Sequence, residues 1–192
     1  MNNHVPDAFV FMKVGPQGRV GAQGSESLEE IFERKKREIE RECKIFWGHG
    51  GKALVPRYVQ CFAKEQGSIH VLMACVKKTA KPQSSSIPRA KEYSTDKKGW
   101  KSIPSGIQTG GRYALVLGEI EKFCVPSLNL GEFEVGIGTK RGKNAAEYVR
   151  GQNDKGCLVR SSSESYQGNV QPSIVSIGFR AELLEPYAVF LQ

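Results

Sequence analysis

The sequence predicts an α+β fold: a mostly antiparallel, barrel-like sheet with one long N-terminal amphipathic helix and a short helix near 144–150. Strand-like segments outnumber helical ones, their order is not a regular β–α–β alternation, and no internal repeat is present. With 192 residues, of which 39% are hydrophobic, the chain can bury one core. We therefore expect a single domain over 1–192.

The long helix is predicted over residues 26–43. Ser27 and Glu30 form an S-x-x-E capping box at its start. Six side chains at three- and four-residue steps share one stripe: Leu28, Ile31, Phe32, Lys35, Ile39 and Cys43. Opposite charges four residues apart are expected to pair on the outer face, Glu33 with Arg37 and Lys36 with Glu40. The basic run at 34–37 is therefore interpreted as a solvated helix face.

The strands are predicted from two-residue alternation or from short apolar runs bounded by turn residues. In chain order they are expected at 8–14, 44–47, 68–76, 112–120, 132–137, 157–160, 173–184 and 186–191. The run at 68–76 is apolar on both faces, which is typical of a central strand. Residues 77–101 are polar, basic and rich in Pro and Ser, so they are predicted to form a long loop excursion from the domain.

The formal net charge of +8 is concentrated in two segments. Residues 77–101 hold eight Lys or Arg against two acidic residues, and residues 138–160 hold six against two. Residues 26–44, with six against seven, are nearly neutral. Two local excesses of positive charge on an otherwise neutral chain favour an anionic partner.

Membrane-spanning and secreted classes are not indicated. No apolar run approaches the ~18 residues of a membrane span, and the N-terminus lacks the basic and apolar regions of a secretion signal. The five cysteines are odd in number and none has the C-x2-C spacing of a zinc site. We therefore expect a cytoplasmic protein with reduced thiols, no membrane partner and no metal site, and the residues point to no particular cofactor.

The most unusual segment of the chain follows the strand at 44–47. It reads Trp47-Gly48-His49-Gly50-Gly51-Lys52, and its glycines allow a tight turn with exposed N–H groups that can bind an anion. We predict that this segment forms a pocket for a base, nucleotide or phosphate. The expected binding residues are Trp47, His49, Gly50, Gly51 and Lys52.

The two basic segments supply the other predicted contacts. These are Lys97, Lys98 and Trp100 in the first segment and Lys140, Arg141 and Lys143 in the second. Cations near aromatic rings are typical of sites for single-stranded nucleic acid. The predicted function is therefore the binding of nucleic acid, a nucleotide or another phosphate-bearing small molecule.

Two other functions remain open. A small hydrolase or transferase acting on a nucleotide would use His49 as its general base. Its carboxylates would come from one of two E-x-E pairs: Glu119 and Glu121, or Glu132 and Glu134. A basic inhibitor or adaptor would instead place the same positive segments against an acidic protein.

Overall fold

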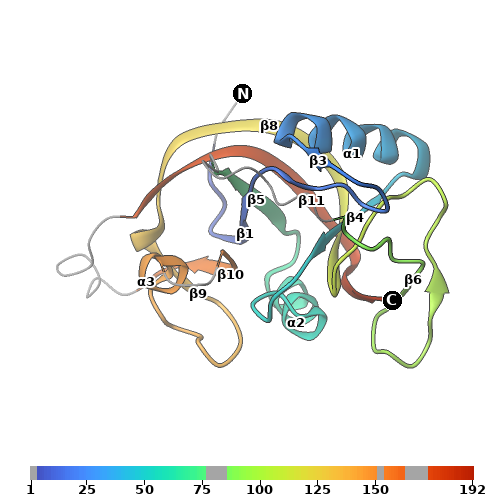
Figure 1. Ribbon diagram of the computed structural model, residues 1–192. Helices are drawn as coiled ribbons and strands as arrows, with labels where there is room; N and C mark the ends of the chain where they lie inside the picture. Colours follow the sequence, from blue (N-terminus) through green and yellow to red (C-terminus); the bar gives the residue numbers. More distant parts are fainter. Residues whose placement is uncertain (1–3, 77–85, 151–153, 163–172) are drawn as a thin grey trace.

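A large mixed sheet dominates the computed structural model, which describes residues 4–76, 86–150, 154–162 and 173–192 (Figure 1). The elements in these ranges are β1 (Ala8–Val14), β2 (Gln17–Gly18), β3 (Ser25–Glu26), α1 (Leu28–Glu42), β4 (Ile45–His49), α2 (Pro56–Gln66), β5 (His70–Cys75), β6 (Glu92–Ser94), β7 (Lys101–Ser102), β8 (Tyr113–Asn129), the 3-10 helix η1 (Leu130–Glu132), β9 (Phe133–Val135), α3 (Ala145–Arg150), β10 (Lys155–Arg160) and β11 (Ile174–Leu191).

The main sheet has the strand order β4, β8, β11, β5, β1, β10, β9. β1 pairs in parallel with β5, whereas the other pairings along this path are antiparallel. The long strands β8 and β11 arch over the molecule, and β6 pairs with the end of β11 (Figure 1). Among the described residues β4 and β9 lie at opposite edges of the sheet and do not pair, so the sheet is open.

The predicted fold class is wrong. The chain is mostly sheet, the sheet is mixed, and it does not close into a barrel. The chain also does not open with a long helix, since β1, β2 and β3 precede α1. Periodicity identifies a strand but not its neighbour, and the parallel partner of β1 is reached only after α1, β4 and α2.

α1 forms where the amphipathic pattern predicts a helix, and its predicted capping box is confirmed. The backbone N–H of Glu30 donates to Ser27 Oγ at 3.2 Å, and the backbone N–H of Ser27 donates to Glu30 Oε2 at 2.7 Å. On the inner face, Ile31 and Phe32 are buried. Phe32 stacks on Phe179 of β11 with ring centroids 4.3 Å apart, which fixes α1 against the sheet.

The charged residues of α1 pair differently from the prediction. Arg34 forms ion pairs with Glu26 and Glu38, and Lys35 is buried and forms an ion pair with Glu38. The expected pairs of Glu33 with Arg37 and of Lys36 with Glu40 are not among the ion pairs of the described residues. Half of the basic run at 34–37 is therefore internal rather than solvated.

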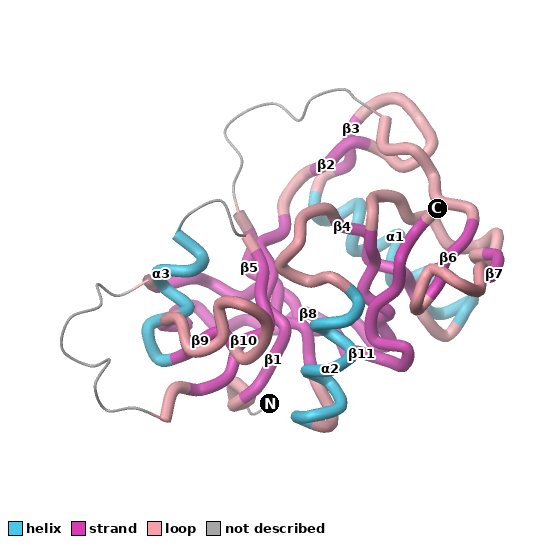
Figure 2. Tube along the Cα trace, turned by 90° about the horizontal axis from the view of Figure 1, so that it is seen from below, coloured by secondary structure: helices cyan, strands magenta, loops and turns pink. Residues whose placement is uncertain are grey.

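α2 occupies residues for which no element is predicted. Pro56 stands at the first helical position, where its missing N–H costs no hydrogen bond. Val59, Phe62 and Ala63 are buried at helical spacing, and Gly67 ends the helix with φ +82°. α2 lies beneath the arch of β8 and β11, as both Figure 1 and Figure 2 show.

The remaining predictions differ from the structure mainly at element ends. The strand expected at 112–120 continues to Asn129, and those expected at 173–184 and 186–191 form the single strand β11 with register shifts along it. The short helix near 144–150 is confirmed as α3. Of the excursion predicted at 77–101, residues 77–85 lie outside the described ranges, and the rest contains β6 and β7.

β1 lies in the core and is buried on both faces. Phe9 and Phe11 belong to a cluster with Phe133 and the buried face of α3. Val10 and Met12 belong to a second cluster, to which both α1 and α2 contribute. α3 packs in the first cluster and α2 in the second, so the two helices lie on either side of the turn that precedes α3. The candidate site lies at this turn.

Candidate functional site

Two of the predicted binding segments meet at one pocket, which lies between α2, the β9–α3 turn and the start of β10. Its volume is about 340 Å³, and its wall contains three lysines and two tyrosines: Lys52, Tyr58, Lys140, Lys143 and Tyr148. Lys52 comes from the glycine turn after β4, whereas Lys140 and Lys143 come from the second basic segment. The volume of this Lys–Tyr pocket falls at the lower end of the range of small-molecule sites, roughly 300–1,000 Å³.

The positive charge of the Lys–Tyr pocket is not matched by ion pairs with the residues that the structure describes. Lys52, Lys140 and Lys143 are exposed, and none forms an ion pair with a carboxylate of the described residues. Glu147 is the one acidic side chain in the described wall, so three positive charges face one negative charge. The resulting potential attracts an anion.

Two glycines allow the tyrosine rings to form the wall. A Cβ atom at Gly138, whose φ is +84°, would lie 3.1 Å from the Tyr58 ring. A Cβ atom at Gly156 would lie 3.1 Å from the Tyr148 ring. Cys157 lies deeper in the pocket, and complete burial raises the pKa of its thiol, so this group is neutral at physiological pH.

The β9–α3 turn is held in shape by its own backbone. The N–H of Gly142 donates to the carbonyl of Val135 at 2.8 Å, and the N–H of Val135 donates to the carbonyl of Lys143 at 2.9 Å. Asn144 then accepts from the N–H of Ala146 at 2.9 Å at the start of α3. Lys140 and Lys143 therefore project from a fixed loop, which lowers the entropy lost on binding.

The first half of the predicted glycine-turn site is buried. Trp47 is in the core, and His49 has 7% of its surface exposed. His49 Nδ1 lies 3.2 Å from the carbonyl of Gly50, and no described residue hydrogen-bonds to Nε2. Burial lowers the pKa of His49 to about 4, so the ring is neutral at pH 7. Only Gly50, Gly51 and Lys52 are exposed.

A row of rings connects His49 with the other basic segment. The His49 and Tyr113 rings are 5.8 Å apart, and the Tyr113 and Phe190 rings are 5.7 Å apart. The Lys97 ammonium lies 4.7 Å from the centre of the Phe190 ring. The chain from β4 to Lys52 thus approaches both basic segments, and Figure 2 shows it between the α3 end and the β6 end of the molecule.

The carboxylate of Asp96 stabilises the turn at 96–99. Asp96 accepts from the N–H of Lys98 at 2.8 Å, and this hydrogen bond lowers the pKa of Asp96. Lys97 and Lys98 are exposed on the turn, whereas Trp100 is half-buried beside it. None of these three residues lines the Lys–Tyr pocket, and neither does Arg141, which is exposed on the β9–α3 turn.

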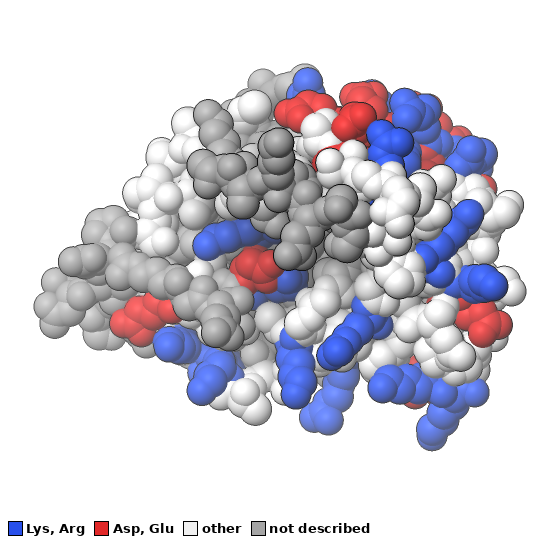
Figure 3. All heavy atoms as spheres, in the orientation of Figure 1, with Lys and Arg blue, Asp and Glu red and all other residues white. Residues whose placement is uncertain are grey.

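A second hollow of about 520 Å³ lies on the other side of α2. Its lining combines the cations Lys64 and Lys101 with the rings of Tyr93 and Tyr187, and the carboxylate of Glu185 also lies in this wall. In Figure 3, Lys and Arg gather along the lower edge of the face shown, over the β9–α3 turn, α2 and the β6–β7 turn, with few acidic side chains among them. The basic segments therefore contribute to one edge of the molecule.

The glutamate pairs of the enzyme hypothesis lie elsewhere. Glu119 and Glu121 line a hollow of about 260 Å³ with His70, and Arg180 donates to Glu121 at 2.8 Å. His49 is not among the residues of this hollow. Glu132 is the last residue of η1 and pairs with Arg160, and Glu134 lies in β9. The structure therefore does not place the candidate base beside either carboxylate pair.

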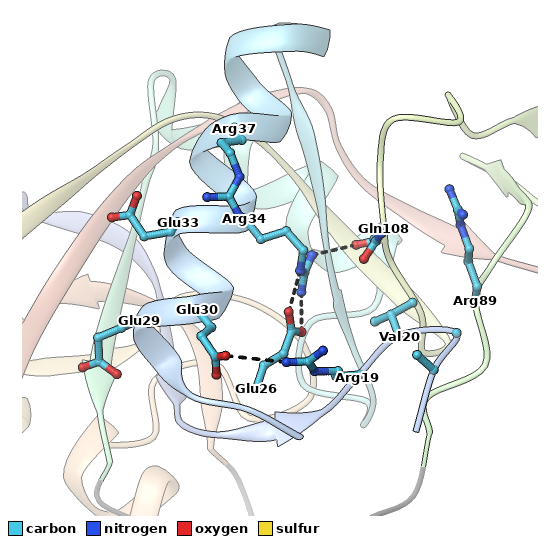
Figure 4. Close-up of a pocket in the computed structure, with 12 residues that line it drawn as sticks. Arg19, Val20, Glu26, Glu29, Glu30, Glu33, Arg34, Arg37, Arg89 and Gln108 are labelled. Carbon is cyan, nitrogen blue, oxygen red and sulfur yellow. Dashed lines mark hydrogen bonds and ion pairs between the residues drawn. The ribbon is translucent and has the colours of Figure 1, made fainter. Parts of the chain in front are cut away.

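A larger hollow of about 690 Å³ lies beside the first turns of α1 (Figure 4). Arg34 occupies its centre and donates to both carboxylate oxygens of Glu26, at 2.9 and 2.8 Å. Arg19 forms an ion pair with Glu30 at 3.6 Å. Because these cations are matched by carboxylates of the same wall, this hollow is less attractive to an anion than the Lys–Tyr pocket.

Sequence reasoning missed the tyrosines of the site. Tyr58 lies in α2, which the patterns of residues 52–67 did not reveal, although Pro56 followed by apolar residues at helical spacing was a usable signal. Tyr148 lies in the predicted short helix but carries no motif. Both become site residues because α2 and α3 pack on opposite sides of the same turn.

Comparison with models of known protein families, with curated proteins and with solved structures found no match. Within the described ranges, no three or more His, Cys, Asp or Glu side chains form a cluster that could hold a metal ion.

Proposed function

We propose that this protein binds a phosphate-bearing partner, nucleic acid or a nucleotide, in the Lys–Tyr pocket. One observation carries the proposal: Lys52, Lys140 and Lys143, from two distant segments, line one pocket without ion pairs to described carboxylates. Three cations around one small pocket are suited to a phosphate group, which carries charge on several oxygens.

The tyrosines supply the second half of the recognition. Aromatic rings bind nucleobases by stacking, which is worth roughly 1–3 kcal/mol per base and depends little on base identity. Tyr58 and Tyr148 are both half-buried in the wall that holds the lysines. In the proposed complex the lysines bind phosphate, and one tyrosine ring stacks on a neighbouring base.

A longer strand would continue along the basic edge. From the Lys–Tyr pocket the exposed cations Arg57 and Lys64 of α2 lead to the second hollow with Lys101. Lys97, whose ammonium lies over the Phe190 ring, is a further cation beside this route. We therefore expect an oligonucleotide to bind more tightly than a mononucleotide, because each added phosphate meets a further cation.

We place the protein in the cytoplasm. In the described part of the chain, no helix has the length and apolar character required to span a bilayer. None of the five cysteines forms a disulfide bond in the structure, which suits a reducing compartment.

The test is a salt titration of binding to labelled oligonucleotides. Single-stranded DNA, single-stranded RNA, duplex DNA and a mononucleotide are compared by fluorescence anisotropy over a range of salt concentrations. We expect log K to fall linearly with log salt, by about 0.7 for each phosphate neutralised on a single strand. The variant Lys52→Gln/Lys140→Gln/Lys143→Gln is expected to lose about two units of this slope.

A charge-matched control separates the site from net charge. Lys36, Lys91 and Lys122 are exposed and line none of the pockets described, so their triple Gln variant lowers the net charge equally. It should keep nearly the wild-type affinity and slope. Absence of binding at low salt, affinity insensitive to salt, or equal losses in both triple variants would contradict the proposal. Salt-sensitive binding to an acidic protein but not to nucleic acid would favour an adaptor instead.

A further inference from the structure

The second hollow, of about 520 Å³, is bounded by two segments with unusual backbone conformations. Among the described residues other than glycine, three have a positive φ, and two of these belong to the segments around this hollow: Tyr187 at +66° and Lys97 at +68°. Tyr187 lines the hollow, and the turn that contains Lys97 contributes Gly99 to its wall. Residues with a Cβ atom rarely adopt this conformation, and those that do cluster at functional sites. The backbone therefore indicates a binding site at this hollow.

An irregularity in β11 brings Tyr187 to the hollow. The register of β11 against β8 shifts between Leu183 and Ala188, and the residues between them, which include Tyr187, leave the ladder. Such a bulge redirects a side chain out of the regular alternation. The chain is fixed on its return by Gln60 of α2, whose amide donates to the Ala188 carbonyl at 2.9 Å. The Tyr187 ring is thus positioned before a ligand arrives, which lowers the entropy lost on binding.

The side chains of the second hollow have the composition of a base-binding site. The rings of Tyr93 and Tyr187 are half-buried in its wall, and the cations Lys64 and Lys101 are exposed beside them. The Tyr187 hydroxyl donates to Glu185, the one carboxylate of the described wall, at 3.3 Å. Glu185 is in none of the ion pairs of the described residues, so it does not neutralise either lysine by direct contact. Aromatic rings beside cations bind an unpaired base and its phosphate.

α2 separates the second hollow from the Lys–Tyr pocket and contributes side chains to both. Tyr58 lines the pocket, whereas Gln60 and Lys64 line the hollow. With 3.6 residues per turn, Gln60 and Lys64 lie about 160° and about 120° around the helix from Tyr58. The exposed side of α2 between the two sites includes Arg57 and Glu65. Both Figure 1 and Figure 2 place α2 between the α3 end and the β6 end of the molecule, so a ligand that reaches both sites has to cross this one helix.

We propose that the second hollow is a base-binding subsite, and that the ligand is an unpaired strand that crosses α2 with one base in each site. The proposal rests on the proposed function, because the Lys–Tyr pocket holds the first base and its phosphate. A helix with its side chains is about 10–12 Å across, and the phosphates of a stacked strand are ~3.4 Å apart, so about four nucleotides span both sites. In a duplex the bases are paired and stacked, and extracting them costs free energy, so a duplex is disfavoured.

The experiment is a length series of oligothymidylates, from one to about eight nucleotides, that compete with a fluorescent octamer at fixed salt. We expect the affinity to rise gradually up to three nucleotides and then to increase by roughly 5- to 150-fold at about four, which is the contribution of one further stacked base. A hairpin duplex of similar length should bind more weakly than the single-stranded octamer.

Substitutions in the two sites should act on different lengths. Tyr187→Leu removes a ring of the second hollow, so it should abolish the step at four nucleotides and leave the mononucleotide affinity unchanged. The matched variant Tyr58→Leu removes a ring of the Lys–Tyr pocket and should weaken binding of every length. Lys101→Gln, at an exposed position, should likewise weaken only the longer strands, which tests the subsite even if Tyr187→Leu does not fold. Lys91→Gln, exposed and outside both sites, is the control of equal charge.

The second subsite is overturned if affinity rises smoothly with length, or if Tyr187→Leu weakens mononucleotide and octamer equally. Equal effects of Lys101→Gln and Lys91→Gln, or a hairpin duplex that binds as tightly as the single strand, would also overturn it. These outcomes leave binding in the Lys–Tyr pocket, and hence the proposed function, intact. Absence of oligonucleotide binding at low salt would instead overturn both proposals.

Discussion

The basic side chains around α1 and those of the Lys–Tyr pocket differ in their surroundings. Those around α1 are largely buried and paired with carboxylates, whereas those of the pocket are exposed. Arg34 and Lys35 lie within 3.0 Å of carboxylate oxygens of Glu26 and Glu38, and their side chains are at most 13% exposed. Lys52, Lys140 and Lys143 are exposed, and no described carboxylate forms an ion pair with them.

This difference explains why the conspicuous basic run at 34–37 is structural. A buried charge must be paired and hydrogen-bonded because its desolvation is costly. Lys35 meets this requirement with three bonds, to Glu38 at 2.8 Å, to the Phe46 carbonyl at 3.1 Å and to the Gln108 carbonyl at 2.6 Å. Burial nevertheless lowers its pKa to about 8. Cations that are paired and hydrogen-bonded in this way hold α1 to β4, whereas the pocket lysines remain available to a ligand.

The largest effect is expected from removing the carboxylate that both Arg34 and Lys35 pair with, that of Glu38. Glu38→Ala leaves Lys35 buried without its ion partner, and we expect a loss of about 3–5 kcal/mol in the free energy of unfolding. Urea denaturation measures this loss. The control Glu33→Ala, at an exposed position of the same helix, should change stability by no more than about 0.5 kcal/mol. Equal effects would show that Glu38 is not a structural centre.

The next effect concerns His49, a buried residue of β4 that forms no ion pair with a residue that the structure describes. Its folded-state pKa of about 4 lies below the ordinary value of 6.5, so the unfolded chain binds the extra proton between these values. His49 therefore favours the fold above pH 6.5, and as pH falls toward 4 this contribution of roughly 3 kcal/mol is lost.

The measurement is the free energy of unfolding as a function of pH for the wild type and for His49→Gln, which cannot titrate. The difference between the two curves isolates His49 from the carboxylates and from His70, whose pKa is also lowered by burial. We expect the wild type to lose more stability than the variant between pH 6.5 and 4. Parallel curves would contradict the assignment.

A smaller effect is expected at Tyr58, whose ring forms part of the wall of the Lys–Tyr pocket. Tyr58→Leu should weaken oligonucleotide binding by about 1–3 kcal/mol through loss of stacking. Tyr58→Phe retains the ring and should bind nearly as the wild type does. If Tyr58→Phe loses as much affinity as Tyr58→Leu, the hydroxyl rather than the ring makes the contact.

The smallest effect is expected at Lys97, where a cation rests on an aromatic ring at the surface. Lys97→Gln removes the contact with Phe190, and such exposed contacts are worth about 0.5–1 kcal/mol. A thermal denaturation curve detects the change. Lys98→Gln, on the same turn, is a control of equal charge and should leave the unfolding temperature nearly unchanged.

Local patterns predicted the elements that depend on neighbouring residues. α1 and its capping box were predictable because Ser27, Glu30 and the buried stripe all lie within one helix. The stripe even included Lys35, although its burial was not expected. α2 was missed since its few apolar residues lie in a short helix, and the sheet was misjudged because strand pairing joins residues far apart in the chain.

The candidate site shows the same division. The residue types were predictable: Lys52, Lys140 and Lys143 were expected to bind an anion, and they line one pocket in the structure. Trp47 and His49, which were also expected to bind, are buried in the structure, because burial depends on what packs over a strand rather than on the strand's own sequence. Whether the pocket binds nucleic acid remains a prediction for the salt titration.

By itself, the sequence determined where positive charge is concentrated, where α1 begins and where the longer strands lie, since these properties depend on composition and on local periodicity. Only the tertiary structure decided which charges are free. Burial paired Arg34 and Lys35 with carboxylates, while the packing of α2 and α3 around the β9–α3 turn brought together three lysines that form no ion pair with a described carboxylate. The physical reason is that net charge is a sum over residues, whereas binding potential depends on distance and solvent access, which the fold alone sets.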